Sequence, residues 1–289
     1  MGDVLDRGKY ARAIFDLLRK LETEAEAAGG QVHLLLGNHE EMNITGIALE
    51  NPDYVTVEQF KSFLPDSYRE KQEKKLKKKG GNGDPDLFWE NLMEDPGASK
   101  EYTDFFNKNY GQWLIEHNVV EKINDIVFVH GGISPADSQK KIEDINRAYR
   151  TEFERYIRGD NFRPKMLFVS AAPLWNRSLA TQNEADYQDD VDQILANLEA
   201  TAIVIAHTPV LIDKNQSRFG GKIWIVDTGI SSVYKGHNSA LVIENGTFSI
   251  RGDQYEQNAG KKNASIGCFS GLRLGVVFWN FAAGAIRTS

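Results

Sequence analysis

The sequence predicts a layered α/β fold in which one sheet is partly antiparallel. A helical pattern and a short apolar run follow one another between residues 10 and 36, which is the repeating unit of such folds. Two more apolar runs, at 126–129 and 202–205, predict further strands. Late consecutive apolar segments around residue 245 carry a hairpin signal, and a tight hairpin joins antiparallel strands.

Each element is predicted from its own pattern. Apolar residues recur at helical spacing over residues 10–21, and Gly29 with Gly30 ends that helix. The run at 32–36 stops at Gly37 and predicts a buried strand. A helix through residues 191–198 precedes the strand at 202–205. The last three predicted strands are 222–226, 240–243 and 247–250, and Glu244-Asn245-Gly246 joins the final two.

Residues 43–124 lack a simple alternating pattern, and we expect them to form a cap-like insert. Within them, Arg69 to Lys79 is a basic stretch that predicts a solvated helix, followed by a loop at 80–85. A cap that faces the substrate and attracts anions is the alternative interpretation of this charge run.

The overall charge and the single cysteine exclude several classes of protein. The 289 residues include 41 acidic and 34 basic side chains, and the net charge of -7 argues against a general nucleic-acid binder. With Cys268 alone, no intrachain disulfide can form, and the compartment stays open between cytoplasm and periplasm. The apolar stretch from Cys268 to Ile286 contains Arg273, which disfavours a membrane span. Residues 254–289 are a tail of unknown role.

Three of the six histidines share one context, an apolar run followed by a loop of small or polar residues. They are His39 in LLLGNHE, His130 in IVFVHGG and His207 in IVIAHTP. Ligands of open α/β sheets bind beyond the carboxyl ends of the strands, so the three imidazoles are expected to converge there. His33 and His117 lack this placement, and we expect structural roles for both.

Carboxylates and an amide accompany these histidines. Asp3, Asp6 and Arg7 lie in one predicted turn, and Asn38 precedes His39. Imidazole, carboxylate and carbonyl oxygen together suit divalent Mn, Fe, Zn or Ni. The sequence therefore predicts a metal site with a guanidinium that binds phosphate.

Four segments resemble the second to fifth motifs of calcineurin-like metallophosphoesterases, in the phosphoprotein-phosphatase branch. They are GDVLDRG at 2–8, GNHE at 37–40, HGG at 130–132 and AHT at 206–208. Longer stretches are similar to bacterial Shewanella-like protein phosphatases: GNHEEMN, VHGGISP, PLWNR and DTGISSVYKGH. The resemblance implies an α/β/β/α sandwich with mixed sheets over residues 1–253.

The resemblance also implies the metal ligands. Asp3 matches the carboxylate that bridges two divalent ions, and Asn38, His130 and His207 match the other ligands of the second ion. The family's first motif, a strand followed by Gly-Asp-x-His, has no counterpart here. We therefore expect the chain to be N-terminally incomplete, with a genuine single-metal or inactive relative as the alternative.

The remaining implied roles concern catalysis. His39 matches the general acid that protonates the leaving oxygen, and Asp6 matches the carboxylate that holds its imidazole. Arg7, Arg177 and Tyr234 match residues that bind the substrate phosphate.

The resemblance implies a hydrolase of phosphate monoesters in which a metal-bound hydroxide attacks phosphorus, with phosphorylated proteins as one substrate class. A dinucleoside polyphosphate hydrolase is the enzymatic alternative. A truncated, non-catalytic protein that binds one metal is the alternative from another class.

Overall fold

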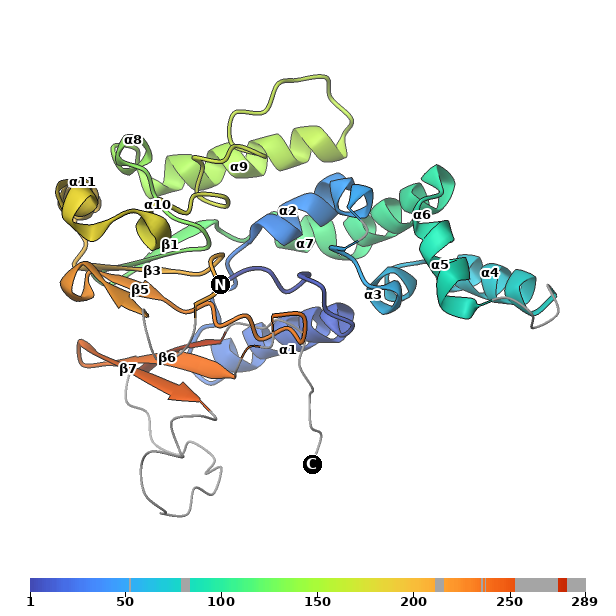
Figure 1. Ribbon diagram of the computed structural model, residues 1–289, viewed down its shortest axis with the longest axis horizontal. Helices are drawn as coiled ribbons and strands as arrows, with labels where there is room; N and C mark the ends of the chain where they lie inside the picture. The colour runs from blue at the N-terminus through green and yellow to red at the C-terminus, as the bar shows by residue number, and fades with distance from the viewer. Residues whose placement is uncertain are drawn as a thin grey trace, which may run out of the picture.

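Figure 1 shows the chain as a computed structural model. The structure describes residues 1–51, 53–78, 84–210, 216–234, 236 and 238–252, together with the backbone of 275–279. The predictions for the loop at 80–83 and for most of the 254–289 tail lie outside these residues.

A mixed sheet of five strands forms the centre of the molecule. Its order is β1-β2-β3-β5-β4, with β2, β3 and β5 parallel and with antiparallel strands at both edges. The strands are β1 Val120–Ile123, β2 Ile126–Val129, β3 Ala202–Ile205, β4 Ser217–Arg218 and β5 Ile223–Ile225. The carboxyl ends of β2 and β3 therefore meet at one edge of the sheet, where His130 and His207 follow them.

A second, antiparallel sheet has the order β7-β6-β8. It consists of β6 Ser239–Glu244, β7 Thr247–Gly252 and β8 Gly275–Trp279. A two-residue turn joins β6 to β7, and its residues Asn245 and Gly246 have φ of 51° and 73°. Positive φ at both positions is the hairpin geometry that Asn-Gly favours.

The two sheets pack face to face through alternate side chains. Phe128 and Val204 of the central sheet share a buried apolar cluster with Leu241 of β6, and Trp224 stacks on Phe248 at 4.8 Å between ring centroids. The opposite face of the central sheet packs under helices, which lie on the other side of it in Figure 1. These helices are α8 Pro135–Ser138, α9 Ile142–Ile157, α10 Ser178–Thr181 and α11 Glu184–Leu198. The predicted α/β fold with mixed sheets is confirmed.

Residues between the first helix and β1 are mainly helical and extend to one side of the sheets in Figure 1. The helices of this part of the chain are α2 Asn38–Thr45, α3 Val57–Ser62, α4 Asp66–Lys78, α5 Pro85–Met93, α6 Pro96–Phe106 and α7 Gln112–Leu114, with the 3-10 turn η1 Ile47–Glu50 and the π-helical turn η2 Asn107–Gly111. Stacked and edge-on rings of Phe60, Phe63, Tyr102 and Phe106 form their core. The first helix, α1 Ala11–Ala27, lies beside β6 in Figure 1, and a 3-10 turn, η3 Phe219–Gly221, precedes β5.

The predicted strand at 32–36 is wrong. Only Leu35 of this run pairs with another segment, through one isolated parallel bridge to Asn118. Beyond Asn118 the chain enters β1, which pairs antiparallel with β2, while the run itself continues into α2 at Asn38, so the ladder stops at one bridge. Within the described residues, no helix combines the length and the apolarity needed to cross a membrane.

Candidate metal and phosphate site

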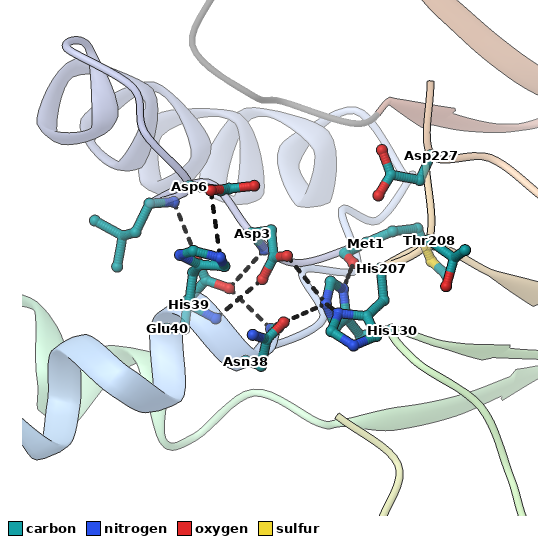
Figure 2. A network of polar contacts seen from close by, with 12 residues as sticks. Met1, Asp3, Asp6, Asn38, His39, Glu40, His130, His207, Thr208 and Asp227 are labelled. Atoms are coloured by element: carbon teal, nitrogen blue, oxygen red, sulfur yellow. Dashed lines mark hydrogen bonds and ion pairs between the residues drawn. The ribbon is translucent and has the colours of Figure 1, made fainter. Parts of the chain in front are cut away.

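The predicted site residues lie at the N-terminal turn, at the start of α2 and after β2 and β3. Figure 2 shows Asp3, Asn38, His130 and His207 pointing toward one another. His130 Nε2 lies 3.0 Å from Asn38 Oδ1, 3.1 Å from Asp3 Oδ2 and 3.2 Å from His207 Nδ1. Four side chains from four distant segments thus bring nitrogen and oxygen atoms to one point.

The surroundings of this cluster favour a positive charge. The carbonyl oxygen of Met1 lies 2.8 Å from His130 Nδ1 and accepts a hydrogen bond from it, which directs Nε2 to the cluster. Burial and the charge of His130 lower the pKa of His207 to about 3, so its imidazole is neutral and can ligate. Burial acts to raise the pKa of Asp3, but the charges of His130 and His39 outweigh it and hold that pKa well below its ordinary value.

The donor set therefore fits a divalent cation. Two imidazoles, a carboxylate and an amide oxygen suit Mn, Fe, Zn or Ni. Burial opposes the proton on His130, yet the Asp3 carboxylate raises the pKa of that imidazole above its ordinary value. A cation at the same point would take the place of this proton as the partner of Asp3.

Glu40 fixes the turn that carries Asp3. Its Oε2 accepts hydrogen bonds from the backbone N–H of Asp3 at 2.7 Å and of Gly37 at 2.8 Å, and its Oε1 accepts one from Leu5 at 3.2 Å. The backbone of the turn passes close to Gly37, where a Cβ would lie 2.3 Å from Asp3 Oδ1. Only glycine leaves room for the carboxylate at this point.

Backbone strain accompanies the site. Three of its non-glycine residues have left-handed φ: Asp3 at 58°, Arg7 at 56° and His207 at 63°. Such conformations cost on the order of 1–3 kcal/mol each and persist where surrounding contacts hold them. Residues in sparsely populated conformations cluster at functional sites, which agrees with the convergence of the side chains.

His39 and Asp6 form a second group beside the first. The distance from His39 Nε2 to Asp6 Oδ1 is 3.3 Å, and His39 Nδ1 is buried without a hydrogen-bond partner among the described residues. The Asp6 carboxylate also accepts from Arg7, whose guanidinium donates to the Tyr234 hydroxyl. The ring of Tyr54 lies edge-on to His39, with 5.1 Å between centroids, and 4.7 Å from the Arg7 guanidinium carbon.

The predicted phosphate residues lie at two places. Arg7 and Tyr234 contact each other beside Asp6, as described. Arg177 lies next to His207, because its Nη1 donates to the His207 carbonyl at 2.6 Å and to Thr208 Oγ1 at 3.0 Å. The Arg7 guanidinium therefore borders the His39–Asp6 pair, and the Arg177 guanidinium borders the cluster of metal ligands.

Comparison with known proteins identifies this arrangement. A profile of the calcineurin-like phosphoesterase family matches residues 1–211. The chain belongs to the calcineurin-like phosphoesterases. This phosphoesterase is 30% identical over 255 residues to an uncharacterized protein of Schizosaccharomyces pombe, with 86% of this chain and 66% of that one covered.

Two similar proteins are phosphatases by name. Shewanella-like protein phosphatase 1 of Plasmodium berghei is 26% identical over 237 residues, which cover 80% of the phosphoesterase and 56% of that protein. The crystal structure of the cold-active protein-tyrosine phosphatase of a psychrophilic Shewanella species superposes with a TM-score of 0.58 and 26% identity. The superposed region covers 87% of this chain and 67% of the Shewanella protein. The phosphoesterase spans 56% to 66% of the length of the two curated relatives named here.

Several residues near the site of the phosphoesterase were not predicted from sequence. Besides Glu40 and Tyr54, Asp227 lies near the cluster in Figure 2, and burial raises its pKa to about 6. Its position after β5, within Asp-Thr-Gly, repeats the strand-end context of the histidines and was the available signal. His33 and His117 lie elsewhere, beside Glu121 and Glu22 respectively.

Proposed function

We propose that this phosphoesterase hydrolyses phosphate monoesters, with phosphorylated proteins as its substrate class. Asp3, Asn38, His130 and His207 would hold a divalent ion. The observation that carries the proposal is the convergence of these four ligand atoms next to the His39–Asp6 pair. A protein that only stored a metal would have no need of that pair.

The divalent ion, when bound, supplies a Lewis acid that polarises the phosphate and lowers the pKa of water. The protein itself provides the proton and the phosphate contacts. Asp6 orients the His39 imidazole through Nε2, which leaves Nδ1 available to donate a proton to the leaving oxygen. Asp6 and Tyr234 hold the Arg7 guanidinium, whose remaining N–H groups can bind phosphate oxygens.

The names of two relatives support protein phosphates as substrates, since one is a Shewanella-like protein phosphatase and another a protein-tyrosine phosphatase. Residues 43–124 would act as the cap beside this site, because Tyr54, in the turn between η1 and α3, contacts His39. The predicted domain, residues 1–253, would then form one catalytic unit.

Hydrolysis of phenyl phosphate in the presence of manganese tests the proposal, because phenol, unlike nitrophenol, needs a proton as it leaves. The variant His39→Asn should retain manganese binding in calorimetry and lose about 10²–10⁴-fold in kcat, as expected for a lost general acid. His130→Ala should instead lose manganese binding. His33→Asn is the matched control, because His33 lies outside the site beside Glu121.

Two results would contradict the proposal. Turnover by His39→Asn equal to that of the wild-type protein would remove His39 from the acid role. Manganese binding without any turnover would favour the non-catalytic alternative.

A further inference from the structure

An apolar cavity of about 310 Å³ opens next to the candidate site. This volume is at the lower end of pockets that bind small molecules, about 300–1,000 Å³. Its apolar lining comes from two parts of the chain that are far apart in sequence. The side chains are Met42, Ile47, Tyr54, Phe168 and Trp175.

The cavity shares two of its walls with the candidate site. Tyr54, which packs edge-on against His39 and lies under the Arg7 guanidinium, is one of them. Trp175 is the other, and its ring lies edge-on to His207 with 6.0 Å between centroids. A phosphate that reached Arg7 and His39 would therefore have the organic part of its ester beside this cavity.

A buried carboxyl group fixes the walls. Glu41 is fully buried, and its Oε1 accepts hydrogen bonds from the Phe168 backbone N–H at 2.6 Å and from Trp175 Nε1 at 3.1 Å. Phe168 has a left-handed φ of 61°, a conformation that needs such contacts to persist. One residue of α2, three positions after Asn38, thus holds the backbone of Phe168 and the indole of Trp175.

Building on the phosphatase function above, we propose that this cavity binds the aromatic ring of an aryl phosphate, with Phe168 and Trp175 as specificity-determining residues and Glu41 as their positioning residue. Flat aromatic walls favour a flat aromatic guest, since ring pairs gain energy beyond the apolar area they bury. An alkyl phosphate would leave the cavity unfilled, so the enzyme discriminates between esters by their leaving groups.

Binding of two phosphonates to the manganese-loaded protein tests this inference without turnover. Phenylphosphonate fills the cavity and methylphosphonate does not, so calorimetry should show about ten-fold tighter binding of the phenyl compound, the size expected for partial burial of one ring. Phe168→Ala should reduce this preference to about three-fold or less while methylphosphonate affinity stays unchanged. Phe168 is 37% exposed, which makes this variant tolerable for folding.

Glu41 is tested by a pair of variants. Glu41→Gln keeps a carbonyl oxygen for both N–H donors and should keep the phenyl preference, whereas Glu41→Leu removes the acceptor and should abolish it. Leu87→Ala, at a 54% exposed position on α5, is the control for a lost apolar side chain elsewhere.

Equal affinity of the wild-type protein for the two phosphonates would overturn the inference, as would a preference that survives in both Phe168→Ala and Trp175→Ala. A protein that prefers phenylphosphonate but hydrolyses no phosphate ester would refute the proposed function and support the cavity. The two conclusions therefore fail in different measurements.

Discussion

Substitution of Glu40 by glutamine tests how the turn that carries Asp3 is held. Glu40 Oε2 accepts from the N–H groups of Asp3 and Gly37, and Oε1 accepts from that of Leu5. A glutamine can keep its oxygen at the Oε2 position, but its NH₂ group then faces the Leu5 N–H. One buried backbone donor loses its acceptor and meets another donor.

The expected cost follows from these contacts. Leaving one buried N–H unsatisfied costs about 1–3 kcal/mol, and the two surviving bonds lose their charge assistance. We expect the free energy of unfolding of Glu40→Gln to fall by about 2–4 kcal/mol in urea titrations. The manganese affinity should fall as well, because Asp3 is displaced from the other ligands.

Glu24→Gln on α1 is the control, since the Glu24 side chain pairs with Lys20 at 3.6 Å on the exposed surface and such pairs contribute about 0–1 kcal/mol. If Glu40→Gln unfolds within about 0.5 kcal/mol of Glu24→Gln, the carboxylate does not hold the turn and the reasoning is wrong.

Four further outcomes are expected. Gly37→Ala should lower manganese affinity at least about ten-fold in calorimetry, because the new Cβ would overlap the Asp3 carboxylate. Gly30→Ala is the control and should leave manganese affinity unchanged, because its Cβ would meet only a carbonyl oxygen at 3.6 Å. Asn146→Ala should lower the free energy of unfolding by about 2–4 kcal/mol in urea, because its side chain bonds the N–H groups of Val119 and Val120. Gly246→Ala should cost about 1 kcal/mol in the same assay, since its φ is 73°. Burial raises the pKa of Glu41 to about 8. Above the ordinary pKa of a glutamate, the unfolded state therefore releases a proton that the folded state keeps, and the folded state loses stability as the pH rises. Between pH 5 and 8, the free energy of unfolding of the wild-type protein should fall by on the order of 3 kcal/mol relative to that of Glu41→Gln, which has no such proton.

The sequence predicted β2 and β3 because burial is complete along both strands. All four residues of both β2 and β3 are buried, so the apolar runs at 126–129 and 202–205 coincide with the strands. The run at 32–36 is equally apolar but pairs at one residue only, and pairing is a property of the partner segment. β1 was missed because Glu121 and Lys122 interrupt its apolar pattern, and its order comes from pairing with β2.

The candidate site was likewise predicted only in part from the sequence. The histidines that follow apolar runs could be predicted as site residues, because strand ends place side chains in a common crevice. Glu40 and Glu41 accept hydrogen bonds from backbone and indole N–H groups up to 134 residues away in the chain. No local sequence pattern predicts partners that are so distant. Tyr54 comes from the helical stretch that has no clear periodicity, so only the folded chain shows that it touches His39.

At the left-handed residues around the site, backbone stability and function favour different side chains. Glycine at Arg7 or Phe168 would relieve roughly 1 kcal/mol of backbone strain and would delete a side chain next to the phosphate or the aromatic guest. A laboratory selection for heat resistance alone would therefore drift toward glycine at these positions and discard function. Ancestral or consensus stabilisation of this chain should hold them constant and seek its gains on the outer surfaces of α9 and α11.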